Sequence, residues 1–297
     1  RMRKLALSDE ILLKVDKAAR YIGGEVNSVM KDKNEVEIRF AMCFPDVYEI
    51  GMSNLGMMIL YNMFNQREDV WCERLFSPWP DLDKVMREQN IPLFALESQE
   101  PIRDFDFLGI TLGYEMCYTN ILQVLDLSGI PLKSADRGED FPIVIGGGAC
   151  AYNPEPLAPF FDLFYIGEGE TVYDALFDAY KANKKAGGSR RDFLLAAAKI
   201  PGIYVPSLYE VTYKEDGTIA SFAPTEAGVP EKVQKQLIID MEKEYRAVEA
   251  PVVPHIKATQ DRVTLEIQRG CIRGCRFCQA GMIYRPTRER DVETLKE

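Results

Sequence analysis

The sequence predicts an α/β protein built on a doubly wound, mainly parallel sheet. Short apolar runs of strand length recur between residues 36 and 167, and stretches with helical spacing separate them. Runs such as PIVIGG at 142–147 are apolar on consecutive residues, which is typical of parallel strands covered on both faces. The chain has 297 residues, of which 46% are hydrophobic, so it can bury a sizeable core and has room for about two domains.

The predicted elements alternate along most of the chain. Ser8 is a suitable N-cap, and a helix is expected from there to a stop at Gly23-Gly24. The following elements are expected as strand 36–44, helix 53–64, strand 70–76, helix 80–89, strands 92–96 and 107–112, helix 118–128, strands 142–147 and 163–167, and helix 170–183. The polar and basic stretch 181–192 is typical of a solvated connection.

The pattern changes after residue 192. A short helix is expected at 192–199, a hairpin around the turn at 215–217, a strand at 262–268 and the beginning of a helix at 287–297. We therefore divide the chain into four parts: an N-terminal helical extension (1–30), an α/β domain (31–185), a connector with a short helix and a hairpin (186–258), and the start of a further domain (259–297).

Composition narrows the partners that the protein can have. The net charge is −10 and the pI is near 4.9, which argues against a dedicated nucleic-acid binder, although residues 261–290 carry seven arginines against three acidic residues. No apolar stretch reaches the roughly 20 residues that span a bilayer, and the basic start lacks the apolar core of a signal peptide. A cytoplasmic protein without a membrane partner is expected.

Seven cysteines are distributed unevenly. Four are scattered and are expected to pack in a core, whereas Cys271, Cys275 and Cys278 form a C-x3-C-x2-C cluster on one short loop. Three thiolates at this spacing can converge on a metal or a cluster, and Gly270 and Gly274 ease the tight backbone that this requires. A structural zinc site normally has four ligands, so three cysteines indicate a site with one open position.

The cysteine loop, with Phe277 before its last cysteine, resembles the motif of radical S-adenosylmethionine (SAM) enzymes. The resemblance implies that Cys271, Cys275 and Cys278 bind a [4Fe–4S] cluster whose open iron binds SAM, and that Phe277 lies near the SAM adenine. Reductive cleavage of SAM to a 5′-deoxyadenosyl radical would follow, with a flavodoxin- or ferredoxin-like protein as the expected electron donor. The order strand, cysteine loop, helix resembles the first βα unit of that family's barrel. A zinc knuckle completed by His255, the chain's one histidine, or by a partner is the alternative.

Three loops that follow predicted strands resemble the ligand loops of a cobalamin-binding, Rossmann-like domain. Their candidate residues are Asp46, Tyr48 and Gly51 in the first loop, Thr111, Leu112 and Gly113 in the second, and Gly146, Gly147 and Gly148 in the third. Tyr48 stands where that family has a cobalt-ligating histidine, and a phenol is a poor substitute for an imidazole. The later motif at 167–170, Gly-Glu-Gly-Glu, is interpreted as a loop-to-helix junction.

The chain as a whole resembles the N-terminal part of a mostly uncharacterised family of radical SAM proteins that begin with a B12-binding-like domain. The implied function is reductive cleavage of SAM on a [4Fe–4S] cluster, with cobalamin as a further candidate cofactor and an unnamed substrate. The alternatives are a non-catalytic module for cobalamin or another nucleotide-like ligand, and a zinc-stabilised interaction protein. Only about 19 residues follow Cys278, so we expect a truncated barrel and a chain that is inactive alone.

Overall fold

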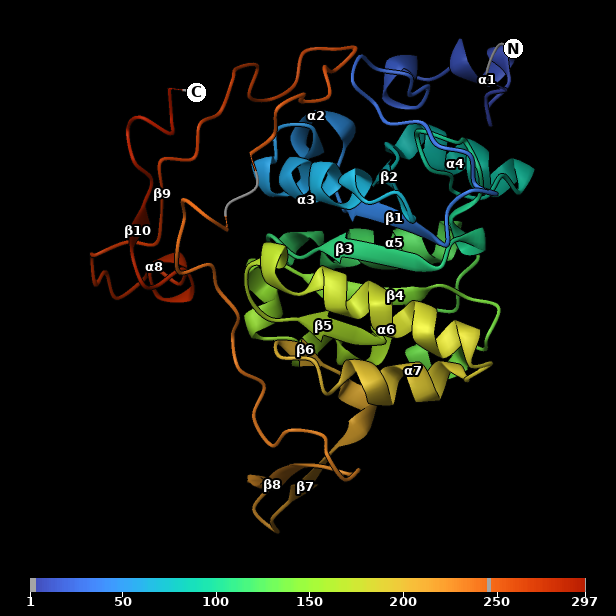
Figure 1. Ribbon diagram of the computed structural model, residues 1–297. Helices are drawn as coiled ribbons and strands as arrows, with labels where there is room; N and C mark the ends of the chain where they lie inside the picture. Colours follow the sequence, from blue (N-terminus) through green and yellow to red (C-terminus); the bar gives the residue numbers. More distant parts are fainter. Residues whose placement is uncertain (1–3, 245–246, 297) are drawn as a thin grey trace.

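The computed structural model describes residues 4–244 and 247–296, and a six-stranded sheet lies at its centre (Figure 1). Its strands are β1 (Ile38–Phe44), β2 (Val70–Phe76), β3 (Phe107–Thr111), β4 (Ile143–Gly147), β5 (Leu163–Tyr165) and β6 (Ile203–Tyr204). The strand order is β2-β1-β3-β4-β5-β6. The first five strands are parallel and β6 pairs antiparallel with β5, so the predicted mainly parallel α/β sheet is confirmed.

This strand order contains a topological switch point. The chain passes from β1 to β2 on one side and returns to place β3 on the other side of β1. Loops that leave neighbouring strands in opposite directions open a crevice beyond their carboxyl ends, and doubly wound sheets bind ligands there. The fold thus places a candidate site beyond β1 and β3.

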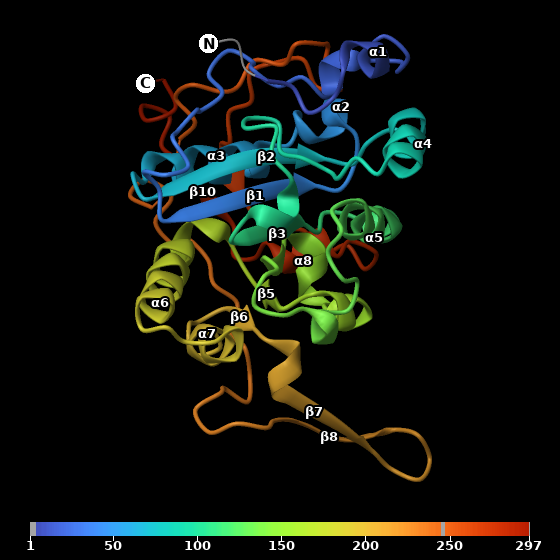
Figure 2. The same ribbon diagram turned by 90° about the vertical axis from the view of Figure 1, so that its right-hand side faces the viewer.

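Helices cover both faces of the sheet (Figure 2). The face packed by α3 (Leu55–Gln66), α6 (Tyr173–Lys185) and α7 (Arg190–Ala197) lies opposite the face packed by α4 (Pro80–Gln89) and α5 (Tyr118–Leu127). Local chemistry sets the helix starts: Asn54 accepts a hydrogen bond from the Met57 N–H, and Ser189 forms a capping box with Asp192. No helix among the described residues is long and apolar enough to cross a membrane.

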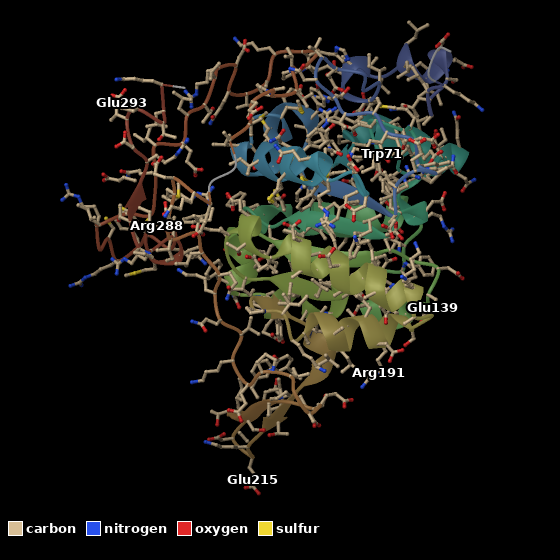
Figure 3. The ribbon with its side chains drawn as sticks, viewed as in Figure 1. Trp71, Glu139, Arg191, Glu215, Arg288 and Glu293 are labelled. Atoms are coloured by element: carbon tan, nitrogen blue, oxygen red, sulfur yellow. The ribbon has the colours of Figure 1, made fainter. Side chains whose placement is uncertain are left out.

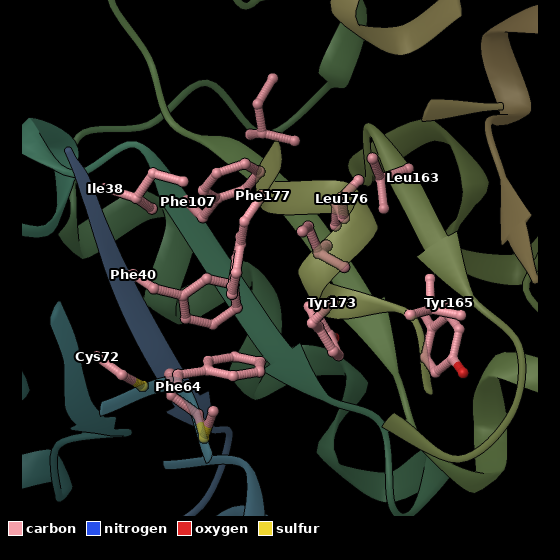
Figure 4. Packing of buried hydrophobic residues seen from close by; sticks show 14 of the residues in the cluster. Ile38, Phe40, Phe64, Cys72, Phe107, Leu163, Tyr165, Tyr173, Leu176 and Phe177 are labelled. Carbon is pink, nitrogen blue, oxygen red and sulfur yellow. The ribbon is translucent and has the colours of Figure 1, made fainter. Parts of the chain in front are cut away.

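An aromatic cluster forms the core under α3 and α6 (Figure 4). Phe40 and Phe107 come from the sheet, Phe64 from α3, and Tyr173 and Phe177 from α6. The rings of Phe64 and Tyr173 lie 4.6 Å apart between centroids, in the range of favourable aromatic pairs. Tyr173 therefore belongs to the core and, as described below, also to a cavity.

Two predicted N-terminal elements differ in the structure. Residues 92–96 form no strand of the sheet; they turn back on themselves, with one bridge between Phe94 and Pro101. The helix predicted from Ser8 is reduced to α1 (Asp9–Leu12) and a turn of 3-10 helix at Ala18–Arg20. Arg20, at the end of this 3-10 turn, is buried and pairs with Glu49 at 2.9 Å.

The C-terminal part also differs from its predicted pattern. The strand expected at 262–268 is paired only as β9 (Gln268–Arg269), which lies antiparallel to β10 (Arg288–Glu289), with α8 (Ala280–Ile283) between them. Over the described residues from 287 onward, β10 and turns stand in place of the expected helix. Val263, Leu265 and Ile267 alternate as a strand would but are exposed, because no described strand lies beside them. The barrel βα unit stays a prediction.

The connector follows its predicted form. A short helix, α7, is followed by a hairpin of β7 (Tyr209–Tyr213) and β8 (Ile219–Pro224), which projects from the body of the molecule (Figure 1). The chain then returns along the sheet and reaches the N-terminal segment, where Val26 bridges Val253. The cysteine-containing segment is thereby brought back to the sheet.

A buried carboxylate joins β4 to the loop that precedes it and to the start of α7. The Asp162 side chain is 2% exposed and accepts hydrogen bonds from Arg137 at 3.0 Å, Arg190 at 2.7 Å and the Val144 N–H at 2.7 Å. Replacing Asp162 by Asn removes the charge that compensates two nearly buried guanidinium groups.

We expect Asp162→Asn to lower the free energy of unfolding by about 3 kcal/mol, measured by urea denaturation. The matched control is Asp174→Asn, whose side chain is 72% exposed although it also pairs with an arginine, Arg67. The control should change stability by about 0.5 kcal/mol or less. Equal losses in the two variants would contradict a special role for the buried pair.

A candidate ligand cavity beside the cysteine loop

A cavity of about 540 Å³ lies beyond the carboxyl ends of β1, β3 and β4, at the switch point of the sheet. The loops after β3 and β4 contribute Thr111, Gly113, Gly147 and Gly148. The opposite wall comes from residues 266–270 and Tyr284 of the segment that carries the cysteines. This volume is typical of small-molecule sites, so the fold offers a ligand site where its topology predicts one.

The floor of the cavity is apolar. Its side chains come from β1, β3, β4 and α3: Phe40, Met42, Ile110, Ile145, Met57 and Leu60. Tyr173 supplies a polar group among them. Its side chain is 6% exposed, and a Cβ placed on Gly147 would lie 3.9 Å from its hydroxyl oxygen.

The Tyr173 hydroxyl has no hydrogen-bond partner among the residues that the structure describes. Burial raises the pKa of Tyr173, so the hydroxyl is neutral and is able to donate or accept a hydrogen bond. The oxygen is therefore available for a hydrogen bond with a group in the cavity.

Four of the nine residues predicted in the cobalamin-like loops line this cavity: Thr111, Gly113, Gly147 and Gly148. Gly148 has φ +110°, and a Cβ there would come within 3.0 Å of the Leu112 carbonyl oxygen, so glycine is required where the loops after β3 and β4 meet. The five that do not line it are Asp46, Tyr48, Gly51, Leu112 and Gly146.

These five residues pack or cap instead. Leu112 is buried, and a Cβ on Gly146 would collide with Phe164, so both belong to the interior of the sheet. Gly51 lies against Phe76 in the same way. The Asp46 carboxylate accepts a hydrogen bond from the adjacent Val47 N–H and lies 3.8 Å from the Cys117 sulfur.

Tyr48 is turned away from the cavity into the protein. It is 1% exposed, and its hydroxyl donates to Glu25 at 2.9 Å and accepts from the His255 N–H at 3.2 Å. Burial raises the pKa of Tyr48. The position that corresponds to the cobalt-ligating histidine is therefore occupied by a phenol whose hydroxyl is already hydrogen-bonded to Glu25 and His255.

The cysteine loop starts at a constrained glycine. Gly270 has φ +86°, and a Cβ there would approach the Pro286 carbonyl oxygen to 2.5 Å. Cys271 and Cys278 are half-buried and Cys275 is exposed. The Arg273 and Gly281 N–H groups lie 3.4 and 3.3 Å from the Cys271 and Cys278 sulfurs, respectively, in hydrogen-bonding geometry.

Three thiols with N–H donors to two of the sulfurs are the donor set that iron–sulfur clusters use. The structure does not gather them: among the described residues, no three His, Cys, Asp or Glu side chains are close enough to hold a metal ion. The His255 ring nitrogen Nε2 lies 3.0 Å from the Gly23 carbonyl oxygen, and Phe277 is 93% exposed. The ligand chemistry fits the cluster, and the loop must rearrange to bind it.

Five side chains hold the cysteine segment against the sheet. This ion cluster consists of Glu168 and Glu170 from the loop after β5, and Glu266, Arg269 and Arg288 from the cysteine segment. Arg269 contacts Glu170 at 2.5 Å, Glu266 at 2.9 Å and Glu168 at 3.3 Å. Arg288 binds both oxygens of Glu168, at 2.7 and 2.8 Å. Figure 3 shows Arg288 beyond one end of the strands and Glu139, which precedes β4, near the other end.

Glu168 is the centre of the ion cluster. Burial opposes its ionisation, but the hydrogen bonds from Arg288 and the Ile238 N–H and the charge of Arg269 outweigh burial, so its pKa lies below the ordinary 4.5. The interpretation of 167–170 as a simple junction missed this role. The signal was available, because this loop also leaves the carboxyl end of a parallel strand.

We expect Glu168→Gln to loosen the cysteine segment, because it leaves Arg288 without a charged partner. Hydrogen exchange of amides in 266–290 should accelerate by at least about tenfold at pH 7. The matched control is Glu289→Gln on β10, an exposed residue next to Arg288. Since the folded pKa of Glu168 is lowered, its stabilisation is complete above about pH 4.5 and disappears as the pH falls further. Unchanged exchange in Glu168→Gln would contradict the proposed anchoring.

Comparison with known protein families gives a match over the part of the chain that forms most of the sheet. The sequence model of a family described as "Radical SAM proteins, N-terminal" matches residues 56–206, just over half of the chain. The uncharacterized protein MJ0966 of Methanocaldococcus jannaschii is 27% identical over 256 residues, which are 86% of this chain and 44% of that protein. The chain therefore spans less than half the length of this relative.

A solved structure with some similarity is that of the radical S-adenosylmethionine methyltransferase TsrM of Kitasatospora setae, with tryptophan substrate and a SAM analogue bound. It is 16% identical, and the match covers 87% of this chain and 44% of TsrM with a TM-score of 0.41.

Proposed function

The chain belongs to the family of radical SAM proteins, N-terminal, and on that premise we propose that it is the N-terminal portion of a radical SAM enzyme. In this proposal Cys271, Cys275 and Cys278 hold a [4Fe–4S] cluster at which SAM is cleaved reductively. The family match ends at residue 206, so the cysteine loop supports the proposal independently of it. Because the chain spans 44% of its relative, the activity is proposed for the longer protein.

The position of the cysteine segment carries the proposal. The ion cluster holds residues 266–270 and Tyr284 against the carboxyl edge of the sheet, where they form one wall of the cavity. A substrate bound in the cavity would lie beside the cysteine segment, partly enclosed by this wall and the sheet. Protection of a reactive species in this way is a task of the protein rather than of the cofactor.

The chain's own residues have defined tasks in this scheme. A bound cluster with SAM supplies one-electron cleavage of SAM to a 5′-deoxyadenosyl radical. The Arg273 and Gly281 N–H groups stabilise the thiolates of Cys271 and Cys278. Five of the seven arginines of 261–290 lie outside the ion cluster, and they would offset the negative charge of the cluster and of the SAM carboxylate. A flavodoxin- or ferredoxin-like protein is the proposed electron donor.

Cobalamin is the second candidate ligand of the proposed enzyme. The glycine loops at Gly113, Gly147 and Gly148 support it, because they allow close approach to the backbone at the switch point. Tyr48 supplies no ligand to cobalt, since its hydroxyl is engaged by Glu25 and His255. Any cobalamin would therefore bind without a histidine or tyrosine ligand from this position.

We expect the anaerobically reconstituted protein to bind about four irons and four acid-labile sulfides per chain, and the full-length protein to cleave SAM under reduction. The triple variant Cys271/Cys275/Cys278→Ala should lose both properties. Cys117→Ala, which removes a half-buried cysteine outside the loop, is the control and should retain them.

Three other outcomes contradict the proposal. Full iron content and SAM cleavage in the triple variant would exclude the loop as the cluster site. About one zinc without acid-labile sulfide would indicate a zinc-stabilised interaction protein. A cobalamin spectrum that persists through gel filtration, without SAM cleavage by the full-length protein, would indicate a non-catalytic binding module.

A further inference from the structure

We propose that the cavity at the switch point binds a small organic molecule with an apolar body, a hydrogen-bonding group that meets the Tyr173 hydroxyl, and no net negative charge. An uncharged molecule or an amine fits this description. The assignment of this molecule as the enzyme's substrate rests on the proposed function. Its binding does not, because the cavity is formed by described residues of the chain without a cluster.

The volume and the apolar lining of the cavity favour a ligand with an apolar body. The strand floor and α3 present aromatic, aliphatic and methionine side chains, and the volume of about 540 Å³ suits a single small molecule. Gly113 and Gly147 border open space in the cavity, since a Cβ on Gly113 would meet nothing within 4 Å and one on Gly147 only the Tyr173 hydroxyl. Filling this space with apolar atoms removes apolar surface from water on both sides.

The Tyr173 hydroxyl favours a ligand that also carries a hydrogen-bonding group. It lies in the lining of the cavity near Gly147, without a partner among the described residues, although the side chain is 6% exposed. Water in the cavity is able to bond this oxygen, so a ligand that displaces the water has to supply a hydrogen bond in its place. The hydroxyl therefore selects a ligand with a donor or acceptor at its buried end.

The charged side chains that line the cavity determine which ligand charge it favours. The charged side chains that line it are Glu168, Glu170, Glu266 and Arg269, a net charge of −2, which Arg288 reduces to −1 because it binds Glu168. Arg269 is already paired with all three carboxylates. An anionic ligand would face this excess of negative charge at close range, whereas an amine would reduce it.

A pair of fluorescent probes tests the assignment on the 297-residue chain without metal. N-phenyl-1-naphthylamine is uncharged and has one N–H, and 1-anilinonaphthalene-8-sulfonate adds a sulfonate to the same skeleton. We expect the uncharged probe to bind at least about tenfold more tightly to the cavity. Tyr173→Phe should weaken its binding about fivefold, whereas Tyr180→Phe on the same helix, whose hydroxyl bonds Asp106, should not.

Binding elsewhere on the chain is separated by a blocking variant. Gly147→Leu places a side chain beside the Tyr173 hydroxyl and should abolish the saturable signal of the uncharged probe. Gly138→Leu is the control, because a Cβ there would meet nothing within 4 Å and Gly138 lies outside the cavity.

Equal binding by Gly147→Leu and Gly138→Leu, or tighter cavity binding of the sulfonate, would overturn the proposal. Displacement of the uncharged probe by hydroxocobalamin would assign the cavity to cobalamin, the second candidate ligand, instead of a small molecule, and would also overturn the proposal. Iron content and SAM cleavage are measured separately, so failure of the cavity assignment is distinguished from failure of the proposed function.

Discussion

One set of ion pairs at the carboxyl edge of the sheet holds the functional parts together. Glu168 receives Arg288 at both oxygens and the Ile238 N–H, while Arg269 joins Glu170 and Glu266. These groups are nearly buried, so each charge is tolerated only while its partners are in place. Three separate stretches of chain, the loop after β5, the connector and the cysteine segment, are thereby fixed as a unit.

The cavity is a consequence of this unit and of the strand order. A parallel sheet with a switch point leaves space beyond β1 and β3, but that space is open to solvent on its outer side. Residues 266–270 close it only because the ion cluster keeps them there. Tyr173 links the cavity to the core, since its ring packs on Phe64 while its hydroxyl faces the cavity. Tyr173 is thus shared between the cavity and the core beneath α6.

Local sequence patterns predicted the sheet well because its strands are apolar on consecutive residues and its helices have clear caps. They were wrong at 92–96, where an apolar run is buried without joining the sheet, since burial alone does not distinguish a strand from a packed turn. In the candidate site, glycines such as Gly147 and Gly148 were predictable from their place after a strand. The ion cluster was not, because Glu168 and Arg288 are 120 residues apart and their pairing depends on tertiary structure.

The exposed alternation at Val263, Leu265 and Ile267 has a consequence for handling the protein. This stretch is an extended backbone with an apolar face and no described strand beside it, which is a template for edge-to-edge pairing with another chain. Glu266 is held by Arg269 in the ion cluster, so the exposed Arg262 is the charge on this stretch that opposes such pairing. Self-association of the isolated chain should therefore begin at this edge, and it should increase with protein concentration and with salt, which screens the repulsion between the Arg262 side chains of two copies.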